Sequence, residues 1–576
     1  MKNILYVLCV SLSAMLVNSC ASHVEEIEPS AYGAFLAARY AGLNQDATSA
    51  ADFYSDALAM EPGDSLLTDR AFITALLAGE LDNGDGLAEA AYRAGDESRL
   101  AGLYFASELL ADRRYSNANE VLQASSDYGP FNAFLAEMFS QWAMLGNGDV
   151  DAALERAQHS SGPGFLAPFL TFHRALLFEA AGHTQEADAA YQASLYSSPL
   201  RRMVTEEYGR FLERENRRDD ARALYQAYLS TTPREASIMY ALDRVQRGAR
   251  APRKLSIAQS AARAGFGPAA RLASQADMEL TVLYLRMLQR LDPDYVPTRL
   301  LLAGTLERIG LADAALAEYA AITRGPYALA AQIDQVWLTA RQDRIEQATF
   351  MARDLVENNT DQEARLMLAD LLRAQSQCSE SEALYAGVID ERDAEGLPGD
   401  WRYHYYRASC LYDLGRWPES EQEFLTALDL APDEPQILNY LGYVWVDEGL
   451  NLERAFSMIE RAAELLPQEG YIIDSLGWAH YRLGDFEAAT FHLERAAALD
   501  PGNATANYHL GDAYWQVGRR LEAGFQWRRT LDLSPTEEEL EGLNFRLEHG
   551  LPEGASGEAE LDIVSNQEAE NQSGQD

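Results

Sequence analysis

The sequence predicts an all-α protein in which helical hairpins stack into a superhelical solenoid. Near the carboxyl end, prolines recur 35, 34 and 34 residues apart, at Pro432, Pro467, Pro501 and Pro535. A fixed period of this length is typical of hairpin arrays, in which each hairpin needs a neighbour to bury its apolar face. The rest of the chain is rich in Ala, Leu, Glu and Arg with a helical period, and the alternation that favours strands is almost absent.

The amino terminus predicts a signal peptide over residues 1–19 and a lipidated linker over residues 20–30. A short positive start precedes an apolar run, residues 4–17, that is too short to span a bilayer comfortably. The run ends before Cys20 in a pattern that resembles a bacterial lipoprotein signal, in which this cysteine is acylated. Acyl chains would anchor the protein stably, and Ala21 at the next position favours the periplasmic face of the outer membrane. An ordinary secretory signal followed by a chance cysteine is the alternative.

The middle of the chain predicts degenerate helical repeats in two stretches, residues 31–250 and 255–390. A basic run with Gly and Pro, Arg247 to Lys254, separates the two stretches, and a second break lies at Asp390 to Asp400. Within the second stretch, Gly265-Phe266-Gly267 precedes a proline without a strand before it, and we interpret this segment as a turn.

Residues 401–535 predict four regular repeats, and the repeat that ends at Pro501 shows the pattern best. Gly477 and Ala489 allow two helices to approach closely, and Gly484 ends the first helix, where a left-handed residue costs little. Leu-Gly, aromatic, Gly, Ala and Pro at these offsets resemble the tetratricopeptide repeat, a helical hairpin of 34 residues. We expect a capping helix over residues 536–553 and a disordered acidic tail over residues 554–576.

Composition excludes several function classes. The net charge of −42 makes nucleic acid a very poor partner. It would instead speed the encounter with a basic protein, or simply keep a large helical protein soluble. Besides Cys20, the chain after the signal has only Cys378 and Cys410, which could form one disulfide or remain two free buried thiols.

No catalytic or metal-binding pattern is evident, so we predict neither an enzyme nor a bound cofactor or metal. His480, His492 and His509 are spaced by 12 and 17 residues, which matches no helical pair of metal ligands. The chain also lacks the Gly-x-Ser-x-Gly motif of a nucleophilic serine and the Gly-Lys-Ser/Thr motif that holds phosphate.

The resemblance to tetratricopeptide repeats implies a protein-binding groove lined by the first helix of each hairpin. The positions that line it in this family correspond here to Tyr405, Tyr412, Tyr443, Tyr471, Trp478, Tyr481, Arg482, Tyr508, Asp512 and Trp515. Aromatic residues and arginine are common anchors of binding hot spots. The alternative is that several of these side chains pack against the adjacent hairpin as ordinary core.

A closer resemblance rests on motifs in the last repeats. These motifs are Leu441–Tyr443, Asp474–Trp478, Tyr481–Gly484, His509–Asp512 and Gly518–Ala523. Together with Cys20 they resemble the outer-membrane tetratricopeptide lipoproteins that act as partners of a periplasmic carboxyl-terminal processing protease. The resemblance implies a nonenzymatic scaffold that activates this protease and brings it substrates such as peptidoglycan hydrolases. A scaffold for outer-membrane assembly or envelope polymer export is the second hypothesis, and a peptidoglycan-active enzyme is the third.

Overall fold

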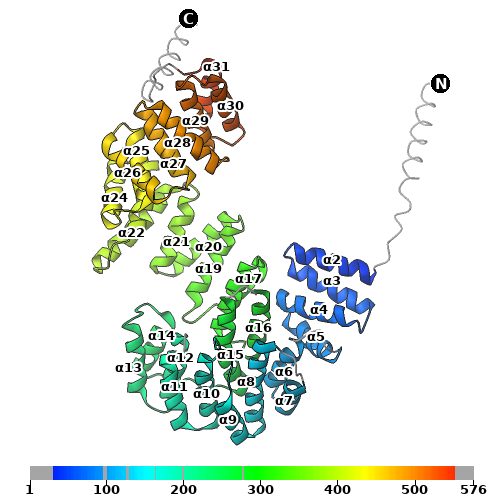
Figure 1. Ribbon diagram of the computed structural model, residues 1–576. Helices are drawn as coiled ribbons and strands as arrows, with labels where there is room; N and C mark the ends of the chain where they lie inside the picture. The colour runs from blue at the N-terminus through cyan, green and yellow to red at the C-terminus, as the bar shows by residue number, and fades with distance from the viewer. Residues whose placement is uncertain are drawn as a thin grey trace, which may run out of the picture. The chain divides into compact units, whose positions relative to one another are not determined.

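The computed structural model describes residues 30–94, 100–124, 129–162, 164–197, 200–274 and 278–551 (Figure 1). In these ranges the regular elements are thirty α-helices, α2 to α31, and no residue is in a strand. The predicted all-α array of helical hairpins is therefore confirmed. Cys20, the predicted signal peptide and the predicted tail over residues 554–576 lie outside the described residues. No helix in the described ranges has both the length and the apolar character that a bilayer crossing needs.

The chain forms two compact units, residues 1–348 (unit 1) and 349–576 (unit 2). The boundary lies inside α20 (Ile345–Asn358). The basic run Arg247 to Lys254 does not separate the units, because it lies within unit 1. Arg218 Nη2 donates to Ala249 O at 3.0 Å, and Lys254 Nζ donates to Ala180 O at 3.1 Å. The run is thus tied to two preceding hairpins.

In unit 1 most consecutive helices pack one against the next, and the exception is the step from α14 to α15. Their bounds are α2 (Ala31–Leu43), α3 (Ala47–Met60), α4 (Ser65–Ala78), α5 (Leu81–Ala94), α6 (Ala101–Ala111), α7 (Tyr115–Ala124), α8 (Gly129–Asn147), α9 (Val150–His159), α10 (Pro168–Ala181), α11 (Thr184–Ser197), α12 (Arg201–Arg214), α13 (Arg218–Leu229), α14 (Ala236–Gln246), α15 (Ile257–Ala273), α16 (Met278–Leu291), α17 (Val296–Arg308), α18 (Ala312–Ala320) and α19 (Ala328–Arg341).

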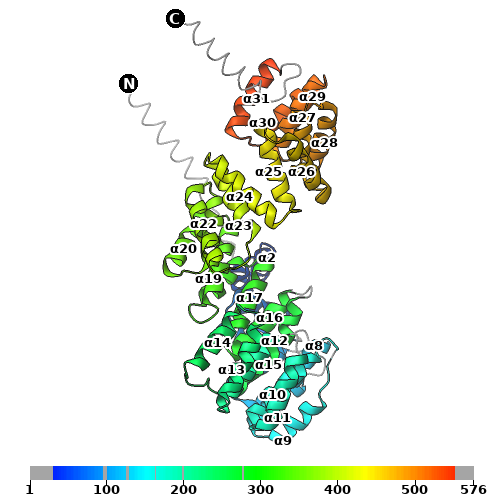
Figure 2. The same cartoon turned by 90° about the vertical axis from the view of Figure 1, so that its left-hand side faces the viewer.

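The hairpin α15–α16 packs against helices that are far earlier in the chain. Helix α15 contacts α6, α8 and α10, and α16 contacts α4 and α6, so the hairpin covers every second helix of the array from α4 to α10 (Figure 1). Both helices are buried along nearly their whole length. Figure 2 shows α15 and α16 enclosed among the other helices of unit 1. The face that such an array would otherwise leave open is therefore filled by the chain itself.

The prediction of a turn at Gly265-Phe266-Gly267 is wrong, because all three residues lie buried inside α15. A Cβ on Gly265 would lie 2.7 Å from Leu288 Cδ2 of α16, and a Cβ on Gly267 would lie 2.6 Å from the Phe169 ring of α10. The glycines are there because α15 approaches its neighbours too closely for a side chain. Local sequence could not show this approach.

A buried arginine ties the hairpin α15–α16 to two other helices. Arg286 of α16 is 2% exposed and donates from Nε to Leu76 O, at the end of α4, at 3.0 Å. It also pairs with Glu318 of α18, whose second oxygen accepts from Arg299 at 2.7 Å. One buried guanidinium thus joins α4, α16 and α18, and its charge is compensated.

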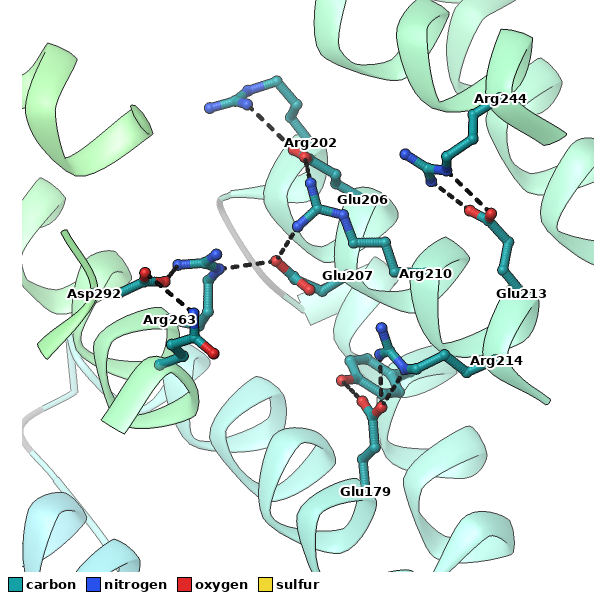
Figure 3. A network of polar contacts seen from close by, with 12 residues as sticks. Glu179, Arg202, Glu206, Glu207, Arg210, Glu213, Arg214, Arg244, Arg263 and Asp292 are labelled. Atoms are coloured by element: carbon teal, nitrogen blue, oxygen red, sulfur yellow. Dashed lines mark hydrogen bonds and ion pairs between the residues drawn. The ribbon is translucent and has the colours of Figure 1, made fainter. Parts of the chain in front are cut away.

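A network of buried ion pairs surrounds α12, as Figure 3 shows. Arg263 of α15 donates to Glu207 at 3.0 Å and also pairs with Asp292. Arg210 pairs with Glu206 at 2.5 Å and with Glu207 at 3.0 Å. Burial alone would raise the pKa of Glu207, but the neighbouring arginines hold that pKa below its usual value. Glu207 is therefore a buried carboxylate that depends on its partners.

Unit 2 continues the array in a more regular form and ends in a single helix. Its helices are α21 (Gln362–Arg373), α22 (Cys378–Ala394), α23 (Trp401–Asp413), α24 (Trp417–Leu430), α25 (Pro435–Asp447), α26 (Leu452–Leu465), α27 (Gly470–Arg482), α28 (Phe486–Leu499), α29 (Ala504–Gln516), α30 (Arg520–Leu531) and α31 (Glu537–His549). Gly484 has φ +81° directly after α27, as the sequence predicts. Cys378 and Cys410 are buried free thiols in the structure.

We expect Gly267→Ala to destabilise unit 1 by about 1–3 kcal/mol, because the new methyl group overlaps the buried Phe169 ring. The measurement is urea unfolding followed by far-UV circular dichroism. The control is Gly86→Ala in α5, where a Cβ meets no atom within 4 Å. This control should be neutral or stabilise by up to about 1 kcal/mol. Equal stability of the two variants would contradict the close packing of α15.

Candidate protein-binding surface of unit 2

The ten residues predicted to line a groove all lie on the first helices of the four regular hairpins. Tyr405 and Tyr412 lie on α23, Tyr443 on α25, Tyr471, Trp478, Tyr481 and Arg482 on α27, and Tyr508, Asp512 and Trp515 on α29. The repeat of 34 to 35 residues brings equivalent positions of successive helices to the same side. All of the predicted residues except Arg482 fall into three groups, which differ in exposure.

The first group consists of tyrosines that reach the surface, and we call it the tyrosine face: Tyr405, Tyr412, Tyr443 and Tyr471. Tyr471 is 42% exposed, and the other three are half-buried. Tyr405 and Tyr412 pack edge-on against the ring of Tyr440, at centroid distances of 5.8 and 6.4 Å. The sequence analysis missed Tyr440, which supports these rings from within α25.

The second group is a stack of flat side chains in the core. The Trp478 ring lies 4.8 Å from the Tyr481 ring and 4.0 Å from the His509 ring, and both pairs are nearly parallel. Tyr481 has no exposed surface, and Trp478 is 6% exposed. For Tyr481 the structure therefore favours the packing alternative over direct contact with a partner, and Trp478 has little surface to offer.

His509 completes this stack with an ion pair. Its Nδ1 lies 3.0 Å from Asp474 Oδ1. Burial by itself would lower the pKa of His509, but Asp474, and more weakly Asp512 and Glu539, hold that pKa above the usual value. The imidazole therefore joins α29 to Asp474 of α27.

The third group is covered by α31, the last helix among the described residues. Asp512 is fully buried, and both of its oxygens accept from Arg546 of α31, at 2.8 and 2.9 Å. Trp515 Nε1 donates to Leu551 O at 2.7 Å, and the Arg546 guanidinium lies 4.5 Å from the Tyr508 ring. Tyr508, Asp512 and Trp515 thus hold α31 in place, and Asp512 cannot touch a partner in this arrangement.

Arg482 also makes an internal contact. Its Nη1 lies 3.2 Å from Asp447 Oδ1, and its side chain is only 9% exposed. The pair joins the ends of α25 and α27 and neutralises part of the local acidic charge. We therefore assign Arg482 a positioning role within unit 2.

Two buried polar atoms near the tyrosine face have no hydrogen-bond partner. Asn439 is 7% exposed, and its Oδ1 accepts no hydrogen bond; Trp478 Nε1 donates none. Such unsatisfied atoms are uncommon in folded proteins and carry a free-energy cost. The sequence analysis missed Asn439. It lies at the helix position that Tyr405, Asp474 and Tyr508 occupy in their own repeats, and this equivalence is the signal that could have identified it.

The described part of the chain holds no cluster of three or more His, Cys, Asp or Glu side chains that could bind a metal ion. His480 and His492 stack on each other with centroids 5.2 Å apart, whereas His509 pairs with Asp474. The three histidines therefore have separate roles in packing. What the site offers is aromatic surface, carboxylates and unsatisfied hydrogen-bonding atoms, which suit recognition of a polypeptide.

Family models place tetratricopeptide repeats in both units. A model described as tetratricopeptide repeat matches residues 172–236 and 366–435, and a second, described as TPR repeat, matches residues 477–518. These matches lie on hairpins of unit 1 and unit 2, so the chain contains tetratricopeptide repeats in both.

A relative supports the same assignment. A TPR repeat-containing protein of Pseudomonas aeruginosa is 26% identical over 198 residues, which are 34% of this chain and 33% of the relative. The matched region thus spans a third of the relative's length.

Solved structures resemble the chain only loosely. The APC/C hetero-tetramer Cut9-Hcn1 aligns over 94% of this chain and 99% of its own, with 14% identity and a TM-score of 0.38. A tetratricopeptide repeat protein from Parabacteroides merdae aligns over 44% and 97%, with 13% identity and a TM-score of 0.37. A TPR protein from Thermus thermophilus aligns over 33% and 98%, with 21% identity and a TM-score of 0.28.

We expect the free energy of unfolding of unit 2 to fall as the pH rises above the usual histidine pKa of 6.5. Because the folded pKa of His509 is raised above 6.5, its stabilisation is complete below that value and is lost as the pH rises through the folded pKa. Each unit of the raised pKa corresponds to about 1.4 kcal/mol. Urea unfolding followed by tryptophan fluorescence measures the effect, and His509→Gln should abolish it.

His492→Gln is the matched control for this pH dependence. Burial and the neighbouring His480 lower the pKa of His492, so its contribution is lost as the pH falls, with the opposite sign. The control should therefore retain the decline above the usual histidine pKa of 6.5. Loss of that decline in His492→Gln, or its persistence in His509→Gln, would contradict the role given to His509.

Proposed function

We propose that this tetratricopeptide repeat protein is a nonenzymatic, membrane-anchored scaffold that binds other proteins through the tyrosine face of unit 2. The observation that carries the proposal is the tyrosine face itself, in which Tyr471 is 42% exposed and three further rings are half-buried. A bound polypeptide would cover these rings. Tetratricopeptide repeats generally mediate contacts between proteins, which supports the same conclusion.

The two units differ in how much of this surface they leave available. In unit 1 the hairpin α15–α16 covers the alternate helices α4 to α10. In unit 2, α31 covers residues of α29, whereas Tyr471 of α27 remains 42% exposed. Among the described helices, α23, α25 and α27 of unit 2 are therefore the best candidates for partner contact.

We further propose that one partner is a periplasmic carboxyl-terminal processing protease, which the scaffold activates and supplies with envelope substrates such as peptidoglycan hydrolases. The support is the set of sequence motifs in residues 441–523 and the predicted lipid on Cys20. An anchored scaffold that holds protease and substrate together raises their effective concentration without chemistry of its own. A scaffold for outer-membrane assembly or polymer export is the second candidate, because an exposed aromatic face would serve it equally well.

We expect the detergent-solubilised full-length protein to bind the purified protease of the same organism. Tyr471→Ala should weaken this binding about tenfold, because an exposed ring supplies contact area to a partner. Its thermal stability should change by less than about 0.5 kcal/mol. Biolayer interferometry and thermal unfolding are the measurements.

Tyr481→Ala is the matched control, since its ring has no exposed surface. This variant should lose about 3–5 kcal/mol of stability. If Tyr471→Ala binds the protease as well as the native protein does, the tyrosine face is not the binding site. If the native protein binds an assembly or export machine and no protease, the second candidate replaces the first.

A separate prediction concerns the membrane anchor. Cys20→Ser removes the thiol that would carry the acyl chains, so the protein should move from the membrane fraction to the soluble fraction when it is expressed in a bacterial host. Ultracentrifugation with immunoblotting measures the distribution, and Cys378→Ser serves as the control. A Cys20→Ser protein that remained in the membrane fraction would overturn the proposed lipidation.

A further inference from the structure

The tyrosine face is bordered by carboxylates. Glu434 precedes α25, Glu469 precedes α27, and Asp447 ends α25; Glu434 is half-buried, and the other two are exposed. Arg482 lies against Asp447 at 3.2 Å and offsets one of these charges. The surface around Tyr443 and Tyr471 therefore has an excess of negative charge.

Helical spacing places the acidic and unsatisfied groups on the same stripes. Asn439, Tyr443 and Asp447 are four residues apart along α25. Residues with this spacing lie one above another on one helix face. On α27, Tyr471, Asp474 and Trp478 follow at intervals of three and four residues, so they also share one face. Each unsatisfied polar atom thus lies on a stripe that also carries a tyrosine and a carboxylate.

The carboxylates around the tyrosine face raise the pKa values of Tyr443 and Tyr471. Burial is the main cause that raises the pKa of Tyr471, and the charges of Glu469 and Glu434 raise it further. Burial also raises the pKa of Tyr443, and the charges of Asp447 and Asp474 raise it further. Carboxylates that influence a tyrosine hydroxyl are close enough to attract a cation placed on the tyrosine ring.

We propose that the tyrosine face binds an extended segment of a partner protein that carries lysine or arginine side chains. The inference rests on the proposed function and specifies the chemistry of the partner. Ammonium or guanidinium groups would lie on the rings of Tyr443 and Tyr471, a favourable cation–π arrangement. They would be paired with Glu434, Glu469 and Asp447.

The carboxylates set the charge that the bound segment must carry. An acidic segment would place like charges together, which disfavours it as the occupant.

The chain's own carboxyl end does not provide such a segment. No lysine or arginine follows Arg546 in the sequence, and residues 552–576 carry several carboxylates. Arg546 is itself paired with Asp512. The described carboxyl end therefore offers no basic segment to this face.

The test uses the full-length protein and two short fluorescein-labelled peptides with amidated ends. One peptide alternates lysine with serine, and the other has glutamate in place of each lysine. Fluorescence anisotropy should show binding of the lysine peptide alone. Its affinity should fall at least about threefold when the salt concentration rises from about 50 to about 300 mM, because salt screens exposed charges.

Two double variants test whether the lysine peptide binds at the tyrosine face. Glu434→Gln combined with Asp447→Asn should weaken the lysine peptide about fivefold. The control, Asp219→Asn combined with Asp220→Asn at the start of α13, removes two surface carboxylates from unit 1 and should change the affinity by less than about twofold.

Three outcomes would overturn the inference: equal binding of both peptides, an equal loss in the control variant, or no binding of the lysine peptide. Equal loss in the control would mean that the overall charge of −42 attracts the peptide without a site. If the lysine peptide fails to bind but Tyr471→Ala still weakens protease binding, the inferred charge preference is wrong and the proposed function stands. If Tyr471→Ala has no effect either, both are wrong.

Discussion

The packing of α15–α16 against α4, α6, α8 and α10 is the interaction on which unit 1 depends. A helical hairpin cannot bury its apolar face alone, and stacking hairpins side by side still leaves one face of the array open. Here the chain closes that face with its own hairpin. Gly265 and Gly267 make the close approach of α15 feasible, because side chains there would overlap Leu288 and Phe169. A large continuous core results, which extends from Phe72 to Leu338.

Closing the array in this way brings charged groups into the interior. Glu207 and Arg263 come from helices that are not neighbours in sequence, and each is almost fully buried. A buried charge without a partner is costly, so the network around α12 gives each of them partners of opposite sign (Figure 3). Loss of one partner would leave a charge uncompensated. The network therefore also specifies where α15 must lie against α12.

In unit 2 the open face of the array is covered in a different way. The last helix among its described residues, α31, covers α29 through the pair of Asp512 with Arg546, and Leu551 just after α31 accepts a hydrogen bond from Trp515. The hairpin that fills unit 1 has no counterpart among the helices described for unit 2. Tyr471 stays exposed, and Asn439 and Trp478 retain unsatisfied atoms. Unit 1 thus buries a face of its array, whereas unit 2 leaves part of its corresponding side chains exposed.

Sequence alone determined the local features of this protein, because they depend on short-range spacing. The helical period predicts the helices. The recurrence of Gly and Pro predicts the regular hairpins, and Gly484 has the left-handed conformation expected from its position at the end of a first helix. Only the tertiary structure decided which faces meet over long distances. Gly267 stands before a proline, a pattern that predicts a turn. In the structure it lies inside α15, where the close Phe169 ring of α10 leaves no room for a side chain. An aromatic residue at a groove position predicts binding, but another part of the chain can cover it. His509 stacks on Trp478, and Leu551, just after α31, accepts a hydrogen bond from Trp515. The period of a helix sets which residues share a face, but burial of that face depends on partners that lie elsewhere in the chain.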